Sequence, residues 1–230
     1  IQLAGADLTD ASLQDADLAE ARMEGVRFGA ADLARSRFEN AILRGADLSK
    51  SRLDGTSFAG ADFGGTAALP RECSNTDFSG ANLSGLHLEA GHFSGADFSA
   101  ANLTKAALSK CDMSEAVFSD ATLAGADLSE SAMARTTADR ADFTRANLRG
   151  ADFSGARLDH ANLQGADLTG CVFAGALLTG SIVDPKIFLE LDLRSTVLEG
   201  ADFRGIDFSG RDLSGCCFSR CNLNEARFEG

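Results

Sequence analysis

The sequence of 230 residues lacks tryptophan and tyrosine, and it holds only two prolines and three histidines. Its 16 phenylalanines are the only aromatic residues, which suggests one kind of interior position used many times. No run of about 18 apolar residues occurs, so we expect no transmembrane helix. Basic residues are scarce, since 21 Lys and Arg stand against 34 Asp and Glu. The net charge of −13 argues against nonspecific binding to nucleic acid or to anionic membranes.

A five-residue repeat runs through the chain. The positions whose numbers leave a remainder of 3 on division by 5 form one register, from Leu3 to Phe228. Of these 46 positions, 42 are Leu, Phe or Met, and all 16 Phe and all three Met of the chain fall there. Two residues earlier, Ala occupies 24 of 46 positions, and the position between them is Asp or Asn in 21 cases. The consensus is therefore Ala-Asp-Leu/Phe-Ser/Thr-Gly.

A period of five matches neither the 3.6-residue period of a helix nor the two-residue period of a strand. The large and the small apolar residue of each repeat are two positions apart, so both lie on the same side of an extended segment. The Asp or Asn between them points outward, and the Ser/Thr-Gly pair is typical of a turn. A short side followed by a corner, repeated many times, predicts a solenoid with a filled interior.

These repeats resemble those of the pentapeptide-repeat proteins, whose motif is A(D/N)LXX. The stretches AGADLTDASLQDADLAEA and RADFTRANLRGADFSGARLDHANLQGADLTG follow the motif closely, and the resemblance covers nearly the whole chain. It implies an all-β fold, a right-handed quadrilateral β-helix in which four repeats make one coil of about 20 residues. We therefore expect about 11 coils in a single domain over residues 1–230. At the β-strand spacing of about 4.8 Å they would form a rod on the order of 55 Å long.

A coil of this length would make residues 20 apart neighbours. Opposite charges on neighbouring strands are mildly favourable, and like charges are unfavourable. Arg replaces the outward Asp at several positions that have Asp one coil away, which predicts the ladders Asp7–Arg27–Asp47, Asp17–Arg37, Asp32–Arg52 and Asp207–Arg227. Two pairs, Asp77–Asp97 and Asp192–Asp212, are exceptions that would stack like charges.

Phenylalanines at the same interval are expected to form the structural core. Two interior stacks follow from the spacing, Phe78–Phe98–Phe118 and Phe188–Phe208–Phe228. Such aromatic contacts stabilise a fold by about 0.5–1.5 kcal/mol per pair beyond the burial of their surface.

Both prolines lie where the motif fails, and this predicts interruptions of the rod near residues 66–75 and 184–191. Proline cannot donate a ladder hydrogen bond, so bulges or loops are expected there. They are either insertions without a role or partner-binding elements. The candidate binding residues are Leu69, Pro70, Arg71, Glu72, Asp184, Pro185 and Lys186.

The reactive residue types follow the repeat, and none of them indicates a catalytic site. Cysteine in the small interior position acts as a slightly larger alanine, and this applies to Cys111, Cys171, Cys216 and Cys221. Cys73 falls in the first interruption. Cys217 takes the outward position, so it should face away from Cys216, which argues against a metal cluster. We expect no enzyme activity and no catalytic, cofactor-binding or metal-binding residue, because a filled interior leaves no ligand-sized cavity.

The expected function is that of a non-enzymatic, rod-like scaffold or spacer that binds a protein partner. The alternative implied by the resemblance is an acidic DNA mimic that binds DNA gyrase or topoisomerase IV and confers quinolone resistance. The acidity of the chain fits that alternative only in part. Sixteen of the 34 acidic residues are the motif's own outward Asp, and without them 18 acidic residues stand against 21 basic ones.

Neither end of the sequence shows a cap, so we expect a fragment of a longer protein or an end-to-end homodimer. Six cysteines that fit reduced thiols favour a bacterial cytoplasmic location. No direct binding of nucleic acid and no membrane insertion are expected.

Overall fold

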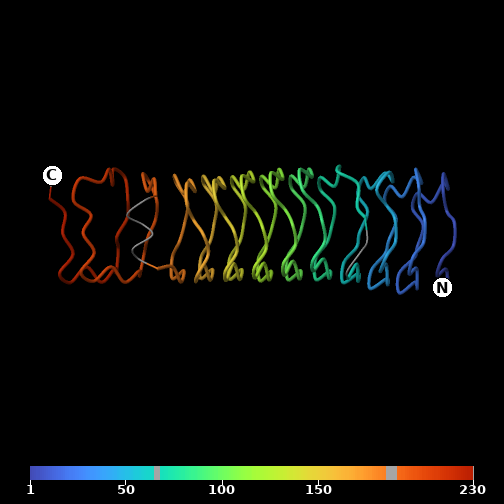
Figure 1. The fold of residues 1–230 in the computed structure, drawn as a ribbon, viewed down its shortest axis with the longest axis horizontal. Coiled ribbons are helices and arrows are strands. Elements are labelled where there is room, and N and C mark those ends of the chain that lie inside the picture. Colours follow the sequence, from blue (N-terminus) through green and yellow to red (C-terminus); the bar gives the residue numbers. More distant parts are fainter. Residues whose placement is uncertain (65–67, 185–190, 230) are drawn as a thin grey trace.

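The protein is a rod in which the chain winds from one end to the other (Figure 1). The computed structural model describes residues 1–64, 68–184 and 191–229. The two ends of the chain lie at opposite ends of the rod, and the middle coils, green to yellow in Figure 1, are stacked evenly. Such an arrangement brings each residue into contact with neighbouring coils only, which is the defining property of a solenoid.

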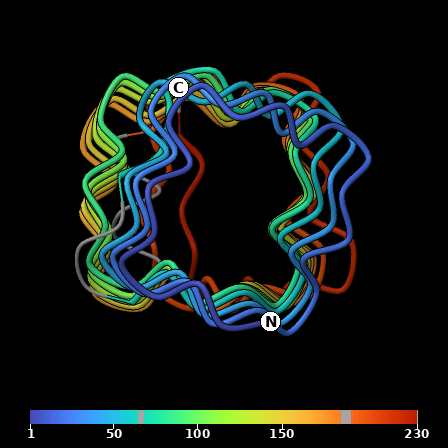
Figure 2. The same ribbon diagram turned by 90° about the vertical axis from the view of Figure 1, so that its right-hand side faces the viewer.

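The cross-section of the rod is four-sided (Figure 2). Parallel bridges join outward residues one coil apart, for example Asn102 with Thr122 and Thr122 with Asp142. Two backbone bonds make the bridge between Asn102 and Thr122. The amide of Thr122 donates to the carbonyl of Ala101 at 2.9 Å, and that of Leu103 donates to the carbonyl of Thr122 at 2.7 Å. A 20-residue coil with one outward residue in the middle of each side is therefore the structural unit.

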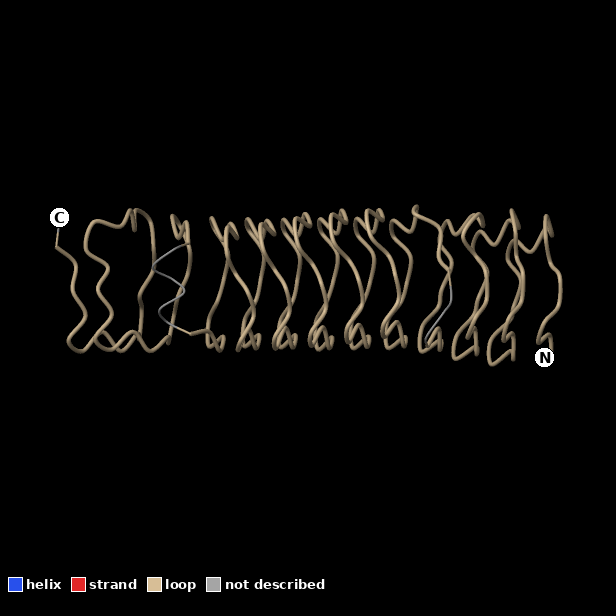
Figure 3. Cartoon of the chain, viewed as in Figure 1, coloured by secondary structure: helices blue, strands red, loops and turns tan. Residues whose placement is uncertain are grey.

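No regular helix or strand occurs in the described part of the chain, which Figure 3 draws as loops and turns throughout. Each side contributes a single bridged residue because a turn follows two residues later. The expected all-β fold is therefore present as parallel β-bridges between coils, but the sides of the coils do not form extended strands. No helix within the described ranges is long and apolar enough to cross a membrane.

Each corner is a tight turn with a left-handed residue. The amide of Ala121 donates to the carbonyl of Phe118 at 2.9 Å, and Asp120 between them has a φ of 61°. A positive φ at the third residue is the mark of a type II turn, which favours Gly or Asn. Nearly every described residue whose number is divisible by five has this conformation. The high glycine content therefore follows from the corners.

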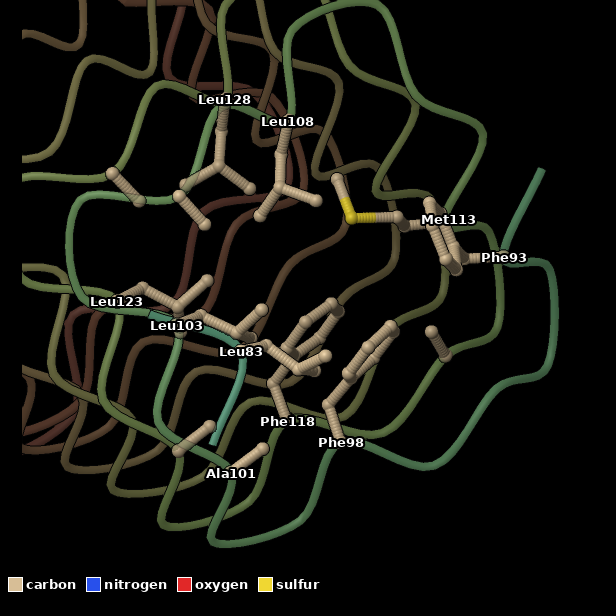
Figure 4. Packing of buried hydrophobic residues seen from close by; sticks show 14 of the residues in the cluster. Leu83, Phe93, Phe98, Ala101, Leu103, Leu108, Met113, Phe118, Leu123 and Leu128 are labelled. Carbon is tan, nitrogen blue, oxygen red and sulfur yellow. The ribbon is translucent and has the colours of Figure 1, made fainter. Parts of the chain in front are cut away.

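The interior is filled by the two apolar positions of each repeat. Leu, Phe and Ala side chains from successive coils pack in columns (Figure 4). The rings of Phe78 and Phe98 stack with centroids 5.3 Å apart, and those of Phe98 and Phe118 with centroids 5.0 Å apart. All three side chains are fully buried. This column is the tightest aromatic stack of the middle coils.

The second predicted stack differs from the first. Phe188 lies outside the described residues, and Phe228 stacks on Phe208 with centroids 5.2 Å apart. The side chain of Phe228 is nevertheless 49% exposed, because no described coil follows it. Phe208 is buried, so Phe228 lies at the edge of the core, a correction to its predicted interior position.

Polar side chains in the small interior position donate hydrogen bonds to backbone carbonyl groups beside the corners. The hydroxyl of Ser131 donates to the carbonyl of Leu128 at 2.7 Å, and the thiol of Cys171 donates to that of Leu148 at 2.9 Å. Buried hydroxyls cost free energy unless they are paired in this way. The tolerance of this position for Ser, Thr and Cys therefore has a local cause.

The first interruption contains a local slip of one residue on one side of a coil. Ala68 bridges Asp47, which is 21 residues earlier, whereas Glu72 bridges His92 at the usual interval of 20. The slip moves Leu69 into contact with the core, and Pro70 is buried. The segment has no large apolar residue in the regular register, and Leu69 packs against the core one position late.

The second interruption coincides with an opening between coils. Val172 still bridges Asp192 one coil later, so the coil length is again 20 residues. On the side of Ile182, however, no bridge joins that residue to Asp202, although both are described. The ladder closes again at the pair formed by Asp202 and Asn222.

Candidate functional site

The outward residues form charge ladders along the rod. Arg27 donates to Asp7 at 2.7 Å, and Arg37 and Arg52 each lie 3.3 Å from an Asp one coil earlier, Asp17 and Asp32. These contacts confirm the predicted interval. They also cancel part of the acidic charge of the early coils, since each joins one carboxylate to one guanidinium.

The two predicted like-charge pairs behave differently. Asp77 and Asp97 do bridge, and the hydroxyl of Ser57 donates to Asp77 at 2.9 Å. Asp192 and Asp212 do not bridge. Arg194 and Arg211 account for the difference. Arg194 binds Asp192 at 2.5 Å and holds the pKa of that carboxyl at about 2, and Arg211 donates to the carbonyl of Leu191 at 2.6 Å, the acceptor that the ladder would use.

A second set of ion pairs lies on the corners, where the sequence reasoning did not look. Arg140 donates to both oxygens of Asp120 at 2.7 and 2.6 Å, and Arg35 binds Asp15 in the same way at 2.7 and 2.6 Å. Arg135 binds Glu115 at 2.7 Å. These pairs also join residues 20 apart. The 20-residue interval that predicted the outward ladders would therefore have predicted them too, if it had been applied to the corner positions.

The ion pair between Arg140 and Asp120 should affect the pKa of the Asp120 carboxyl. Hydrogen bonds from Arg140 lower the pKa of the Asp120 carboxyl. The change Arg140→Gln should raise this pKa toward its ordinary value, as measured by NMR titration of the carboxyl carbon. The stabilisation from this pair is present above the unfolded-state pKa and is lost as the pH falls through the folded-state value. Arg145→Gln is the matched control, because Arg145 lies on a corner without a described ion pair, and an equal shift there would contradict the assignment.

The cysteines are free thiols that differ in burial. Burial raises the pKa of Cys73 to about 12 and that of Cys171 to about 12. Hydrogen bonds from Ser219 lower the pKa of the Cys217 thiol instead. Since the thiolate is the reactive form, iodoacetamide at pH 8 should label Cys217 first and should spare Cys73 and Cys171 until the chain unfolds. Peptide mass mapping with the Cys217→Ser variant as control tests this order, and early labelling of Cys171 would contradict it.

The predicted loop residues do not form one surface. Leu69 packs against the core and Pro70 is buried, whereas Arg71 and Glu72 are exposed, with Glu72 3.7 Å from the ring of His92. Asp184 is exposed. Pro185 and Lys186 lie outside the described residues. Arg71, Glu72 and Asp184 therefore remain candidate contacts, and the first interruption contributes two of them.

A cluster of apolar residues occupies outward positions that are polar on most of the rod. Val172, Leu177 and Ile182 take three consecutive outward positions, and Leu177 bridges Val197 on the next coil. We call these four residues the apolar belt. The side chain of Ile182 is 55% exposed. Leu177 and Val197 lie side by side on one side of the rod, whereas Val172 and Ile182 lie on the two adjoining sides. Apolar residues that adjoin one another on a surface mark interaction sites more often than scattered single residues do, and sequence reasoning missed this pair.

A groove with a volume of about 930 Å³ adjoins the belt. It opens between residues 181–183 and 201–203, where the ladder is missing, and its lining includes Leu178, Leu198, Phe203, Arg204 and Glu225. Apart from such surface grooves, the described interior is occupied by side chains. No group of three or more His, Cys, Asp or Glu within the described ranges could hold a metal ion.

Comparisons with known proteins agree with this fold. The family model for pentapeptide repeats matches eight copies, over residues 1–29, 31–66, 72–109, 96–133, 116–155, 139–175, 156–183 and 192–230. None of the curated proteins matches the chain.

Solved structures of pentapeptide-repeat proteins are similar. Rfr23 from the cyanobacterium Cyanothece 51142 is 24% identical with a TM-score of 0.48, and the match covers 50% of this chain and 92% of Rfr23. HetL from Nostoc sp. strain PCC 7120, described as involved in the regulation of heterocyst differentiation, is 23% identical with a TM-score of 0.41 over 94% of this chain and 90% of HetL. QnrB1, a plasmid-mediated fluoroquinolone resistance protein, is 19% identical with a TM-score of 0.28 over 94% and 90%.

Pentapeptide-repeat proteins fold as right-handed quadrilateral β-helices, and the four-sided coils with bridges one coil apart are the features seen here. The family model accounts for almost every repeat of the sequence, including those on both sides of the two interruptions. The chain therefore belongs to the pentapeptide-repeat family.

Proposed function

We propose that this chain is a non-enzymatic scaffold or spacer, a rod of about 11 coils that binds a protein partner through its outer surface. The observation that carries the proposal is the apolar belt of Val172, Leu177, Ile182 and Val197 on a surface whose outward positions are otherwise mostly polar. Protein interfaces have apolar centres with polar rims, and the bridged pair of Leu177 and Val197 would supply such a centre. The filled interior supports a role that does not involve a bound substrate.

The experiment is capture of partners from an extract of the source cells by the immobilised chain. A double variant, Leu177→Ser with Val197→Ser, removes two apolar residues that bridge each other. The matched control is Asn102→Ser with Thr122→Ser, a bridged pair that is already polar. A partner lost with the first variant and kept with the second supports the proposal. Capture of no protein above the background of a bare support would contradict it.

The second candidate function is DNA mimicry toward DNA gyrase or topoisomerase IV. The net charge of −13 favours it, and the guanidinium–carboxylate pairs along the rod weigh against it because they lower the charge that a partner would meet. A plasmid-supercoiling assay with gyrase decides between the two. Inhibition, or protection from a quinolone, at micromolar protein would favour mimicry over the scaffold.

The proposed location is the bacterial cytoplasm. All six cysteines are free, and free thiols persist where the cell keeps them reduced. Mass determination of the chain from its source cells, with and without a reductant, measures this directly. An intact disulfide in the unreduced sample would contradict the proposed location.

A further inference from the structure

Four backbone groups are unpaired at the groove between residues 181–183 and 201–203. On one side these are the carbonyl of Ser181 and the amide of Val183, and on the other they are the amide and the carbonyl of Asp202. None of the four has a hydrogen-bond partner among the described residues. Backbone groups that lack partners are costly when they lose water, so open strand edges are places where another strand can pair.

The order of these groups matches the donors and acceptors of one added strand in parallel orientation, which would enter beyond the corner where the amide of Gly180 donates to the carbonyl of Glu199 at 3.1 Å. In the intact ladder, an outward residue donates its amide to the residue before its neighbour and accepts from the residue after it, as Thr122 does with Ala101 and Leu103. A strand between the two sides of the groove would make this pattern of hydrogen bonds once with residues 181–183 and once with residues 201–203. Its central residue would donate to Ser181 and accept from Val183, while its two flanking residues would pair with the amide and the carbonyl of Asp202. Three residues would thus satisfy all four groups.

The same register fixes which side chains the strand must carry. The central residue would point outward beside Ile182, and the flanking residues would point inward. The inward side is apolar, with Leu178, Leu198 and Phe203 in the groove lining. A small residue before the centre and a large apolar residue after it would follow the small–outward–large order of the chain's own repeats.

Charge at the groove favours a basic residue at the end of the strand. Asp202 is neutralised by Arg204, which approaches its carboxylate at 2.7 Å. Glu225 also lines the groove and has no described ion pair. It lies on a corner beside Gly205, whose amide bonds to the neighbouring Asn224. A parallel strand would run toward this corner, so Lys or Arg after the large apolar residue would meet Glu225.

We propose that residues 181–183 and 201–203 bind an extended segment of a partner protein as an added parallel strand. Four consecutive residues of that segment would be a small residue, any residue, a large apolar residue and a basic residue. This rests on the proposed scaffold function and gives its partner a chemical class. Peptide recognition by strand addition takes its affinity from main-chain bonds and its specificity from alternate side chains. The apolar belt would extend the contact beyond the groove.

The test uses a blocked peptide, acetyl-Ser-Gly-Ala-Thr-Leu-Lys-Gly-amide, titrated into the chain and followed by NMR. Binding should slow hydrogen exchange by at least tenfold at the amides of Val183 and Asp202, for which no acceptor occurs among the described residues. The control peptide carries Pro in place of Thr, which removes the donor to Ser181. It should bind roughly three- to tenfold more weakly, the usual effect of losing one backbone hydrogen bond.

The matched protein variants are Asp202→Pro and Asp142→Pro, at equivalent outward positions of one side. The amide of Asp142 donates to Ala121 at 2.9 Å, so proline there should destabilise the rod. The amide of Asp202 is unpaired, so Asp202→Pro should unfold at nearly the same temperature as the parent and should lose peptide binding. Asp202→Asn keeps the amide and should bind like the parent.

Three results would overturn the inference. The first is no binding up to the solubility limit of the peptide, and the second is equal affinity for the proline peptide. In either case the scaffold proposal would still stand if partner capture depends on Leu177 and Val197. The third is concentration-dependent dimerisation that protects the Val183 amide without peptide, because the added strand would then come from a second copy of this chain.

Discussion

The change Phe98→Ala is expected to lower the free energy of unfolding by about 3–5 kcal/mol, the usual cost of removing a fully buried phenylalanine. The ring of Phe98 stacks between Phe78 and Phe118, with centroids 5.3 and 5.0 Å away, and meets the edge of Phe93 at 5.6 Å. Its neighbours belong to columns held by the coils on both sides, so they cannot collapse far into the space left behind. Urea unfolding followed by circular dichroism measures the loss.

Two further variants separate the loss of the ring from general damage. Phe98→Leu introduces the other large residue that the position accepts throughout the chain, so its cost should be smaller. His87→Ala changes an exposed side chain and should alter stability by no more than about 0.5 kcal/mol. A Phe98→Ala variant as stable as His87→Ala would mean that the ring is not in the core.

The loss should also be local. In a solenoid each coil touches only its neighbours, so stability is approximately a sum of repeat terms and nearest-neighbour terms. Hydrogen exchange should therefore accelerate most in the coils that contain Phe78, Phe98 and Phe118. Amides near Phe153 and Phe173, which belong to a separate stack with centroids 5.4 Å apart, should change less.

The coil and its core could be predicted from the sequence because they depend on periodicity. One register holds every Phe and Met, and an interval of 20 residues places Arg27 beside Asp7. Even Ala138, an exception to the large interior residue, is buried in a continuous coil. Its neighbours above and below obey the repeat and hold it in place.

The features that the sequence did not predict depend on departures from strict periodicity. Leu69 is one position out of register, and only the bridge from Asp47 to Ala68 shows that it replaces the missing apolar residue. The apolar belt left a signal in the sequence, since Val172, Leu177 and Ile182 occupy consecutive outward slots. The groove left only an indirect signal, the interruption predicted near residues 184–191, because the sequence pattern does not show how far apart two coils lie.

Thr136 and Thr137 offer the sharpest test of which side of the chain faces inward. Thr136 is buried, and its hydroxyl donates to the carbonyl of Met133 at 2.9 Å. Thr137 points outward and bridges Arg157 on the next coil. The change Thr136→Asp would place a carboxyl in the apolar interior, whereas Thr137→Asp would place one beside a guanidinium. Neighbouring residues with the same substitution should therefore differ greatly in stability.

The expected cost of Thr136→Asp depends on pH. Burial disfavours the charged form and raises the carboxyl pKa in the folded state. If that pKa reaches 7 or more, the cost at pH 7 is about 4 kcal/mol, since each unit above the unfolded value near 3.9 contributes about 1.4 kcal/mol. The penalty is absent below the unfolded-state pKa and grows as the pH rises toward the folded-state value. Urea midpoints measured at pH 4 and pH 7 should therefore differ more for this variant than for the parent chain.

Thr137→Asp should remain within about 0.5 kcal/mol of the parent at both pH values, because the half-buried Thr137 points outward beside Arg157. Thr136→Ser, which keeps a hydroxyl able to reach Met133, controls for the loss of that bond. If Thr137→Asp were the costly variant, the side that we assign to the interior would face solvent, and every column of the core would have to be reassigned. Because the coil repeats one pattern throughout, this pair of adjacent threonines tests the orientation of the whole rod.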